Sequence, residues 1–569
     1  MARYPDAFNP DLLERIPLAA RTILDVGCAT GSLGAAYRRL NPASRLLGIE
    51  RDPESAATAA SRLDEVAILD IEQADVPFDL PDGLDCIVYG DVLEHLVDPW
   101  AVLRRHADLL TPDGVMLLSV PNIEHWSFVA RLLQGNWDYE DIGLLDRTHL
   151  RWFSLESMRR GLTECGLVPC DVAPRIFRAE QGRAFVETIT PALEALDVDV
   201  EGYSARALPL QFVWRVRRRP PRTLRVVSTM MDHVGGVSVV RITDPMRAIA
   251  TDPDIATHIV KSPVIPTPGP DVPKIFVLHR PVLAGENAVQ LLRTLLTAGY
   301  VIVTEFDDLP DHFPALRETD ALSFRGVHAV QSSTEPLGAI LRASNPETVV
   351  FPNAIRTLPA IRNFADPRRM TLFFGGLNRE ADWEPYVPTL NAVAAMAGER
   401  LGFRIVHDRA LFDALQTPHK EFTPTCDYDT YLDLLGRSEI SFMPLADTPF
   451  NRAKSDLKFI EAGACRVAAL ASPVVYASSV KDGQTGVLFR TPDELRTALL
   501  RLITQPHRTQ ALGDAARTYV QRDRMLAAQV QARITWYRSL WDRRAELTAA
   551  LLARTPELAH APALSPVGE

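Results

Sequence analysis

Residues 23–34 read ILDVGCATGSLG, and this stretch decides the fold of the first part of the chain. Its first four residues have the apolar, partly β-branched character of a buried strand. A turn spaced by Gly27, Gly31 and Gly34 follows, and then the helix-forming segment AAYRRL. Glycine lacks a Cβ and reaches positive φ at little cost, so such a turn lets the backbone approach a ligand closely. The glycines alone are compatible with a dinucleotide, a nucleoside sulfonium, or a close contact between helix and strand.

Acidic residues mark four successive apolar runs. Asp25 lies inside the first predicted strand, where a cationic ligand would gain from its charge and a phosphate would not. Glu50 closes the run RLLGIE, at the spacing of ~20 residues at which an acid can accept ribose hydroxyls. Asp70 and Asp91 close the runs VAILD and DCIVYGD. Successive strand ends therefore present carboxylates to one crevice, where open α/β sheets bind ligands.

With DVLEHL at 91–96 and LLTPDGVMLLSVPN at 109–122, this pattern resembles the class I S-adenosylmethionine-dependent methyltransferases. The stretch GNWDYEDIGLLDRTHLRWFS at 135–154 resembles the subgroup found among bacterial surface-polysaccharide gene products. The resemblance covers residues 1–214, and a Rossmann-like domain that binds NAD or nothing is the alternative. Ala29 stands where the middle glycine usually is; the extra methyl group can be accommodated if φ stays negative, so we expect ligand binding to survive. The resemblance implies a site for S-adenosyl-L-methionine formed by Asp25, Gly27, Gly31, Glu50, Asp70 and Asp91.

Methyl transfer to a hydroxyl requires a positioned acceptor and a group that removes a proton. His95, just past the fourth predicted strand, is our first candidate for this base. His125 and His149 are rivals, and each of the three can instead be a hydrogen-bonded structural histidine. They lie in or near the segment 122–153, whose aromatic and polar side chains are suited to covering a substrate.

Composition limits the class of protein. The chain has 569 residues, too many for a single core, and a formal net charge of −11, which argues against nucleic acid as a partner. Its six cysteines form no C-x-x-C pair, so we expect reduced thiols. No apolar run reaches the ~18 residues of a membrane span, and the start MARYPDAFNP has no signal-peptide pattern. We therefore expect a cytoplasmic protein.

Residues 215–225, RVRRRPPRTLR, mark a boundary between predicted domains, because the paired prolines disfavour a helix across them. We interpret 215–223 as a solvated Arg/Pro linker, with a patch for anionic membranes as the alternative. Two further βα series predict Rossmann-like lobes at 224–360 and 361–530. A C-terminal helix and a disordered tail are expected at 531–569. The predicted fold class is α/β with three Rossmann-like lobes.

The stretch 441–489 carries the most specific pattern of the second half. It contains NRAKSDLKFIEAGA, ends in DGQTGVLF, and resembles the donor site of the retaining GT-B glycosyltransferases of family 4. The resemblance implies a two-lobed enzyme, with 224–360 on the acceptor side and 361–530 on the nucleotide-sugar side. The pairs Gly235–Gly236 and Gly375–Gly376 would let the backbone close on donor or acceptor, or are simply tight strand-to-helix turns.

The resemblance also implies individual roles. Glu461 matches the glutamate that binds the donor ribose, and Lys454 and Ser455 match groups that contact the diphosphate. A nucleoside diphosphate leaving group needs positive charge, so Lys454 is the catalytic candidate here. Arg379 is a second candidate for the phosphates.

One residue departs from the family pattern. The usual two glutamates are eight positions apart, and the position eight before Glu461 is Ala453, so the glutamate associated with the transferred sugar is missing. The acidic run Glu305, Asp307 and Asp308 is similar to the metal-binding D-x-D of another glycosyltransferase fold. We expect it instead to line the cleft between the lobes or to cap a strand end, with no metal bound.

The sequence thus predicts a bifunctional transferase that uses S-adenosyl-L-methionine and a nucleotide-sugar donor on a bacterial surface glycan or its lipid-linked precursor. Peripheral contact with the inner face of the membrane, and association with other glycan-assembly enzymes, are compatible with this prediction. One alternative is a methyltransferase whose GT-B half is an inactive binding or docking module. Another is a structural protein that uses both folds only to dock partners.

Overall fold

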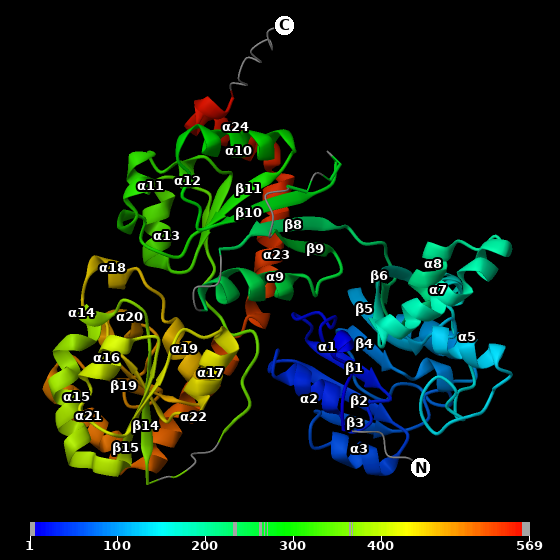
Figure 1. Ribbon diagram of the computed structural model, residues 1–569, viewed down its shortest axis with the longest axis horizontal. Helices are drawn as coiled ribbons and strands as arrows, with labels where there is room; N and C mark the ends of the chain where they lie inside the picture. Colours follow the sequence, from blue (N-terminus) through cyan, green and yellow to red (C-terminus); the bar gives the residue numbers. More distant parts are fainter. Residues whose placement is uncertain are drawn as a thin grey trace, which may run out of the picture. The chain divides into compact units, whose positions relative to one another are not determined.

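The computed structural model describes residues 6–231, 236–260, 265–266, 268–269, 271–362, 366 and 368–559 (Figure 1). The chain forms two compact units. Unit 1 comprises Met1–Arg222 with Thr251–Asp254, and unit 2 comprises Thr223–Ala250 with Ile255–Glu569. Their three sheets are built mainly of parallel strands with helices between them, which confirms the predicted α/β class. Among the described residues, no helix combines the length and apolar character needed to cross a bilayer.

In the described part of unit 1, seven strands form one sheet in the order β3-β2-β1-β4-β5-β7-β6 (Figure 1). The strands are β1 (Thr22–Val26), β2 (Arg45–Glu50), β3 (Glu65–Ile68), β4 (Leu84–Gly90), β5 (Leu110–Pro121), β6 (Val168–Ile176) and β7 (Pro209–Arg217). The first five are parallel, whereas β7 runs antiparallel to both β5 and β6. Parallel strands with crossover helices are covered on both faces, which explains the apolar run LDCIVYG of β4.

The strand order of unit 1 reverses between β1 and β4. Such a reversal leaves a crevice outside the carboxyl ends of the two strands. The turn into α2 borders this crevice, and so does the 3-10 turn η1 (Leu93–His95) that follows β4. The helices are α1 (Pro10–Leu13), α2 (Ser32–Arg38), α3 (Pro53–Ala59), α4 (Pro99–Ala107), α5 (Trp126–Leu133), α6 (Leu155–Glu164), α7 (Ala179–Ala195) and α8 (Val200–Ala207).

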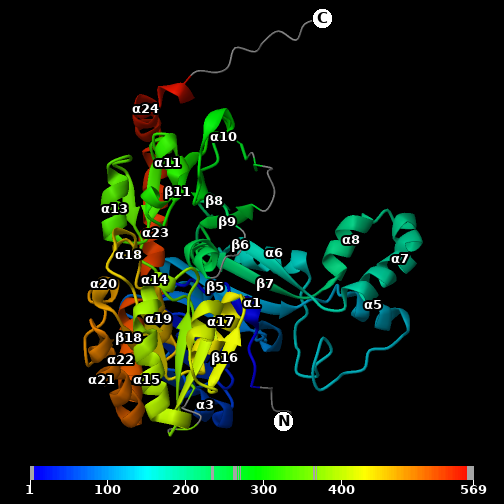
Figure 2. The same cartoon turned by 60° about the vertical axis from the view of Figure 1, so that its left-hand side comes forward.

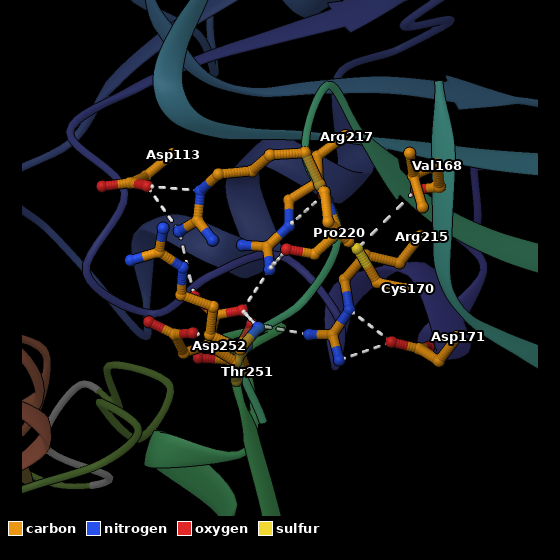
Figure 3. Close-up of polar contacts among 12 residues, drawn as sticks. Asp113, Val168, Cys170, Asp171, Arg215, Arg217, Pro220, Thr251 and Asp252 are labelled. Carbon is orange, nitrogen blue, oxygen red and sulfur yellow. Dashed lines mark hydrogen bonds and ion pairs between the residues drawn. The ribbon is translucent and has the colours of Figure 1, made fainter. Parts of the chain in front are cut away.

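The arginine-rich stretch is part of the folded core of unit 1 (Figure 3). Arg215 and Arg217 belong to β7 and are only 7% and 1% exposed. Arg217 forms an ion pair with buried Asp254, and Arg219 lies 2.9 Å from the same carboxylate. The prediction of a solvated linker at 215–223 is therefore wrong for these residues, because their guanidinium groups neutralise carboxylates of the same unit.

Unit 2 contains two lobes, each built on one parallel sheet. The first lobe has the strand order β13-β12-β11-β10-β8-β9. These strands are β8 (Leu224–Thr229), β9 (Ile255–Val260), β10 (Lys274–His279), β11 (Val301–Glu305), β12 (Ala329–Ser332) and β13 (Thr348–Val350). The helical elements are the π-helical turn η2 (Val239–Thr243), α9 (Asp244–Ile249), α10 (Gly285–Thr297), η3 (Pro310–His312), α11 (Pro314–Glu318), α12 (Leu322–Arg325) and α13 (Glu335–Arg342).

The second lobe has the strand order β16-β15-β14-β17-β18-β19. Its strands are β14 (Met370–Gly375), β15 (Leu401–Val406), β16 (Lys420–Thr423), β17 (Ile440–Met443), β18 (Ala468–Ala471) and β19 (Gly486–Leu488). Its helices are α14 (Glu380–Trp383), α15 (Val387–Ala397), α16 (Arg409–Ala414), α17 (Tyr428–Gly436), α18 (Pro449–Arg452), α19 (Leu457–Ala464), α20 (Pro473–Tyr476), α21 (Pro492–Thr504) and α22 (Pro506–Asp523), with short 3-10 turns at Glu384–Tyr386 and Gly398–Arg400.

The C-terminal helices α23 (Ala527–Asp542) and α24 (Arg544–Arg554) return to the first lobe, beside its green strands and helices in both views (Figures 1 and 2). The hydroxyl of Tyr537 donates to Oε1 of Gln331 at 2.9 Å. Leu551 and Leu558, the latter in the 3-10 turn η6 (Pro556–Leu558), complete the core of that lobe. The end of the expected tail, 560–569, lies outside the described residues.

Candidate active sites

The turn after β1 contains three residues with positive φ: Gly27 at 71°, Ala29 at 46° and Gly31 at 75°. A Cβ at Gly27 would lie 2.5 Å from Cγ2 of Val92, so the turn needs glycine for space as well as for φ. The negative φ on which the sequence-based acceptance of Ala29 rested is not found, and the expectation that ligand binding survives stays a prediction. The N–H of Ala29 donates to Oε2 of Glu50 at 2.9 Å, which holds the left-handed conformation at a cost of roughly 1 kcal/mol.

Asp25 and Glu50 lie at the carboxyl ends of neighbouring parallel strands. Asp25 is 8% exposed, and among the described residues no hydrogen bond to its carboxylate contributes to its pKa. Burial, together with the nearby charge of Glu50, raises the pKa of Asp25 to about 7. Glu50 accepts from the N–H groups of Ala29 and Asp52 and keeps further lone pairs on both oxygens. Asp25 is thus the acid whose negative charge is least satisfied by the protein, and a cationic ligand would supply the missing partner.

Asp70 and Asp91 follow the ends of β3 and β4 at the same edge of the sheet. Asp70 stabilises its own turn, since its carboxylate accepts from the N–H of Glu72 at 3.0 Å. Asp91 accepts from the hydroxyl of Ser119 at 2.9 Å and from Nε2 of Gln211 at 2.8 Å, while burial raises its pKa. The fold therefore brings all four predicted acids to one edge, where Glu50, Asp70 and Asp91 already accept hydrogen bonds from protein groups.

Hydrogen bonds orient the ring of His95. Its Nδ1 lies 3.2 Å from the carbonyl oxygen of Thr148, an atom that can only accept, so Nδ1 carries the proton. The hydroxyl of Thr148 lies 3.0 Å from the same nitrogen and donates to Oδ1 of Asp146 at 2.7 Å. The Nε2 atom of His95 therefore keeps its lone pair, which is the tautomer that a general base needs.

His149 and Glu94 adjoin His95. The ring centroids of the two histidines are 4.8 Å apart, and Nδ1 of His149 lies 3.3 Å from the carbonyl oxygen of Leu144. Glu94 is 1% exposed, and neither oxygen of its carboxylate has a partner among the described residues. One donor atom from each of Glu94, His95 and His149 lies within 4.8 Å of the others. A carboxylate and two imidazoles are ligands that suit a divalent cation. The sequence predicted no metal site here and no role for Glu94.

His125 fits the structural alternative. Its Nδ1 accepts from the N–H of Ser127 at 3.4 Å and so caps the start of α5. Burial lowers the pKa of His125 to about 4, which keeps the ring neutral. Among the three candidate histidines, only His95 and His149 are brought together.

In the second lobe of unit 2, Glu461 on α19 is 3% exposed. Its Oε1 accepts from the hydroxyl of Tyr428 at 2.8 Å. Burial raises the pKa of Glu461 to about 7, opposed by the charge of Lys458. Lys458 donates to the carbonyl of Gly375 at the end of β14. The sequence analysis missed Lys458, although its place one helical turn before Glu461 was a usable signal.

Two of the predicted phosphate-binding cations flank one aromatic ring. The Nζ of Lys454 lies 4.1 Å from the ring centroid of Phe450, and the guanidinium of Arg379 lies 5.9 Å from it. Arg379 also donates to Oδ1 of Asn451 at 3.0 Å. Lys454 forms an ion pair with Asp308 of the first lobe, 2.9 Å away. The chain therefore gathers positive charge where the two lobes of unit 2 meet.

Ser455 joins a network that begins in the first lobe. Its Oγ accepts from Nδ2 of Asn353 at 2.8 Å, and Oδ1 of Asn353 accepts from Arg241 at 2.9 Å. Arg241 and Glu305 form a buried ion pair with distances of 2.7 and 3.1 Å. Glu305 is the last residue of β11, so the acidic run does lie at a strand end. Asp308 contacts Lys454 of the second lobe, which agrees with a position between the two lobes of unit 2.

The glycine pairs allow close contact with α17. Gly235 lies outside the described residues. A Cβ at Gly236 would lie 2.5 Å from Cδ2 of Tyr428, and one at Gly375 would lie 2.5 Å from Cε2 of Tyr431. These glycines thus bring the backbone against two tyrosine rings of the second lobe.

Comparison with known proteins gives a different match for each half of the chain. A family model described as a methyltransferase domain matches residues 1–170, and one described as glycosyl transferase-like matches residues 379–535. The chain carries a methyltransferase domain and a glycosyltransferase domain. The match to the methyltransferase domain includes His95 and His149, and the match to the glycosyltransferase domain includes Lys454 and Glu461.

Curated relatives are similar to part of the chain. The ubiquinone biosynthesis O-methyltransferase of Xanthomonas euvesicatoria pv. vesicatoria (strain 85-10) is 32% identical over 24% of this chain and 63% of its own length. The protein of that name from Azorhizobium caulinodans is 29% identical over 23% of this chain and 52% of its own length. The chain thus spans less than two thirds of the length of these relatives.

Solved structures also align with part of the chain. Anabaena Alr3699/HepE in complex with UDP-glucose aligns with 56% of this chain and 99% of its own, at 12% identity and a TM-score of 0.41. Sucrose-phosphate synthase from Thermosynechococcus elongatus aligns with 56% of this chain and 100% of its own, at 14% identity and a TM-score of 0.42.

Proposed function

We propose that the chain is a bifunctional enzyme that transfers a methyl group from S-adenosyl-L-methionine in unit 1 and a sugar from a nucleotide-sugar donor in unit 2. The observation that carries this proposal is that each of the two family matches contains a buried carboxylate, Asp25 at 8% and Glu461 at 3% exposed, and burial raises the pKa of both to about 7. Asp25 lies two residues before Gly27, and Lys458, one helical turn before Glu461, donates to the carbonyl of Gly375 at the end of β14. Two such sites in one chain favour two small-molecule donors.

The residues of unit 1 fit S-adenosyl-L-methionine, which supplies a methyl group on a positively charged sulfonium. Asp25, buried and with no hydrogen bond from the described residues contributing to its pKa, offers the negative charge. Glu50 keeps lone pairs for ribose hydroxyls beside the turn of Gly27 and Gly31. In this proposal Nε2 of His95 takes the proton of the acceptor hydroxyl, a contribution of about 10²- to 10⁴-fold for a well-placed base.

The residues of unit 2 fit the departure of a nucleoside diphosphate. Lys454 and Arg379 face the same ring and supply positive charge to the developing phosphate charge. The N–H and hydroxyl of Ser455 are further donors, and ionised Glu461 would accept from ribose hydroxyls. We propose transfer with retention of configuration, as in the glycosyltransferases that the segment 441–489 resembles.

We further propose that the protein acts in the bacterial cytoplasm on a surface glycan or its lipid-linked precursor, with peripheral contact to the membrane and to other glycan-assembly enzymes. Joining two sites in one chain raises the effective concentration of the second site for the product of the first. The second candidate is a methyltransferase with a docking half. It is favoured by Ala453, which leaves the second lobe without a carboxylate at that position.

Isothermal titration tests the proposal. S-adenosylhomocysteine, UDP and GDP are titrated into the full chain and into the Asp25→Asn and Glu461→Gln variants. We expect the chain to bind S-adenosylhomocysteine and one nucleotide, and each variant to lose only its own ligand. Binding of S-adenosylhomocysteine without any nucleoside diphosphate would leave the docking candidate, and binding of neither ligand type would exclude both enzymatic candidates.

A further inference from the structure

The segment before α19 is bound to the first lobe of unit 2 through four consecutive contacts. This segment, residues 450–455, contains the phosphate-binding candidates Lys454 and Ser455 and the position that lacks the family's carboxylate, Ala453. The contacts are the rings of Phe450 and His312 with centroids 4.5 Å apart, the carbonyl of Ala453 accepting from Thr334 at 3.2 Å, the ion pair of Lys454 with Asp308, and the hydrogen bond of Ser455 with Asn353. The first lobe therefore forms one wall of the proposed diphosphate site.

Asp308 is the acidic group of that wall. Its side chain is 11% exposed, and its Oδ1 accepts from Lys454 at 2.9 Å and from the N–H of Leu309 at 3.0 Å. Its Oδ2 is 3.7 Å from the guanidinium of Arg280, which lies beyond hydrogen-bond length. Oδ2 of Asp308 thus retains acceptor capacity, although the residue as a whole is only 8% exposed.

Asp307 differs from its neighbour. Its Oδ1 lies 2.5 Å from Nε of Arg280, and this ion pair holds the pKa of Asp307 below its ordinary value against the effect of burial. Because cations of the chain already neutralise Asp307 and Asp308, the pair is not arranged as a metal site. Asp308 is the member of the pair whose carboxylate faces Lys454.

The geometry of a sugar nucleotide connects Asp308 to the sugar. A Lys ammonium has three donors, so Lys454 can hold Asp308 and a phosphate oxygen together. A sugar bonded to that phosphate is then within reach of the carboxylate of Asp308, which lies 2.9 Å from Nζ of Lys454. Sugar hydroxyls are donors, and a carboxylate with free lone pairs is a strong acceptor for them. Across the segment, Ala453 offers only a methyl group, and its carbonyl is already bonded to Thr334.

We propose that Asp308, supplied by the first lobe, binds the hydroxyl groups of the transferred sugar at the place where the second lobe offers Ala453. This inference rests on the proposed function of the site in nucleotide-sugar binding. It makes Asp308 a residue that distinguishes a nucleotide sugar from the corresponding nucleoside diphosphate.

The test compares two affinities in the full-length protein. UDP-glucose, UDP-N-acetylglucosamine and GDP-mannose are titrated alongside UDP and GDP, and the nucleotide sugar that binds most tightly is compared with its own diphosphate. We expect Asp308→Asn to lower the ratio of the two affinities by tenfold or more. Lys454→Met should weaken both ligands by a similar factor, and Asp311→Asn, a matched change three residues away, should change neither.

The outcomes separate the role of Asp308 from the proposed glycosyl transfer. If Asp308→Asn changes both affinities by the same factor, Asp308 only neutralises Lys454 and the inference is overturned. If the unaltered protein binds the nucleotide sugar no more tightly than UDP or GDP, the inference is also overturned, while nucleotide binding stands. If it binds no nucleotide, the proposed glycosyl transfer itself fails.

Discussion

The imidazole rings of His95 and His149 meet edge to face with their centroids 4.8 Å apart. We expect His95→Ala to lower methyl transfer by about 100-fold or more, because Nε2 of His95 is the proposed proton acceptor. The rate of S-adenosylhomocysteine release with a panel of hydroxylated acceptors measures this loss, and the affinity for S-adenosylhomocysteine should not change. His125→Ala is the control, since loss of a helix cap should lower stability and leave the rate intact. An unchanged rate for His95→Ala would exclude its role as base.

The raised pKa of Asp25 links methyl-donor binding to stability. In the folded chain the pKa is about 7, above the ordinary 3.8, so the stabilisation that Asp25 gives is complete below about pH 4 and is lost as the pH rises through about 7. Asp25→Asn should therefore raise the melting temperature of unit 1 at pH 8 while weakening S-adenosylhomocysteine binding. Calorimetry at pH 5 and pH 8 measures the first effect. A variant that melts lower at pH 8 would contradict the assignment.

Ala29 has φ of 46°, where glycine suffers no steric strain. Ala29→Gly removes roughly 1 kcal/mol of strain but makes the unfolded chain more flexible, so we expect a net gain of about 0.5 kcal/mol. Chemical denaturation monitored for unit 1 checks this value. Ala35→Gly, in the interior of α2, should instead destabilise by about 1 kcal/mol. Equal losses in both variants would show that φ at position 29 is not strained.

Glu461 should control nucleotide binding. Its pKa of about 7 means that the charged form, the stronger acceptor for ribose hydroxyls, becomes dominant only above neutral pH. We expect the affinity for UDP or GDP to rise between pH 6 and pH 8, and Glu461→Gln to lose about 10- to 100-fold at pH 8. Glu439→Gln, a buried acid at the start of β17, is the matched control and should affect only stability. A flat pH profile would argue against ionised Glu461 as the ligand.

Arg217 is 1% exposed, and its partner Asp254 is 5% exposed. Burial alone would raise the pKa of Asp254, but hydrogen bonds from Arg217, Arg222 and Arg219 lower it to about 2. The stabilisation is therefore present above about pH 4 and is lost as the pH falls towards 2. Arg217→Met should destabilise unit 1 by about 3 kcal/mol at pH 7, because it removes the most deeply buried cation that pairs with the carboxylate of Asp254 and leaves only Arg219 and the N–H of Arg222. Arg219→Met, whose side chain is 32% exposed, should cost about 1 kcal/mol or less in the same denaturation experiment.

The fold was predictable because its signals are local. The apolar run of each strand, the turn residues after β1 and the acids at strand ends lie within a few residues of one another, and parallel topology places such ends at one edge. The same holds for Lys454, Ser455 and Glu461, which occupy one short segment and one helix. The linker prediction at 215–223 failed because the partners of its arginines, Asp171 and Asp254, are remote in sequence.

By itself, the sequence determined the α/β class, the two kinds of domain, and the acids and cations that border each site, because these depend on residue type and short spacing. Tertiary structure alone decided the positive φ of Ala29, the grouping of Glu94 with His95 and His149, and the pairing of Lys454 with Asp308. His95 and Thr148 are 53 residues apart in the chain, and Lys454 and Asp308 are 146 residues apart. Contacts over such separations follow from the packing of strands, loops and lobes, which no local pattern encodes.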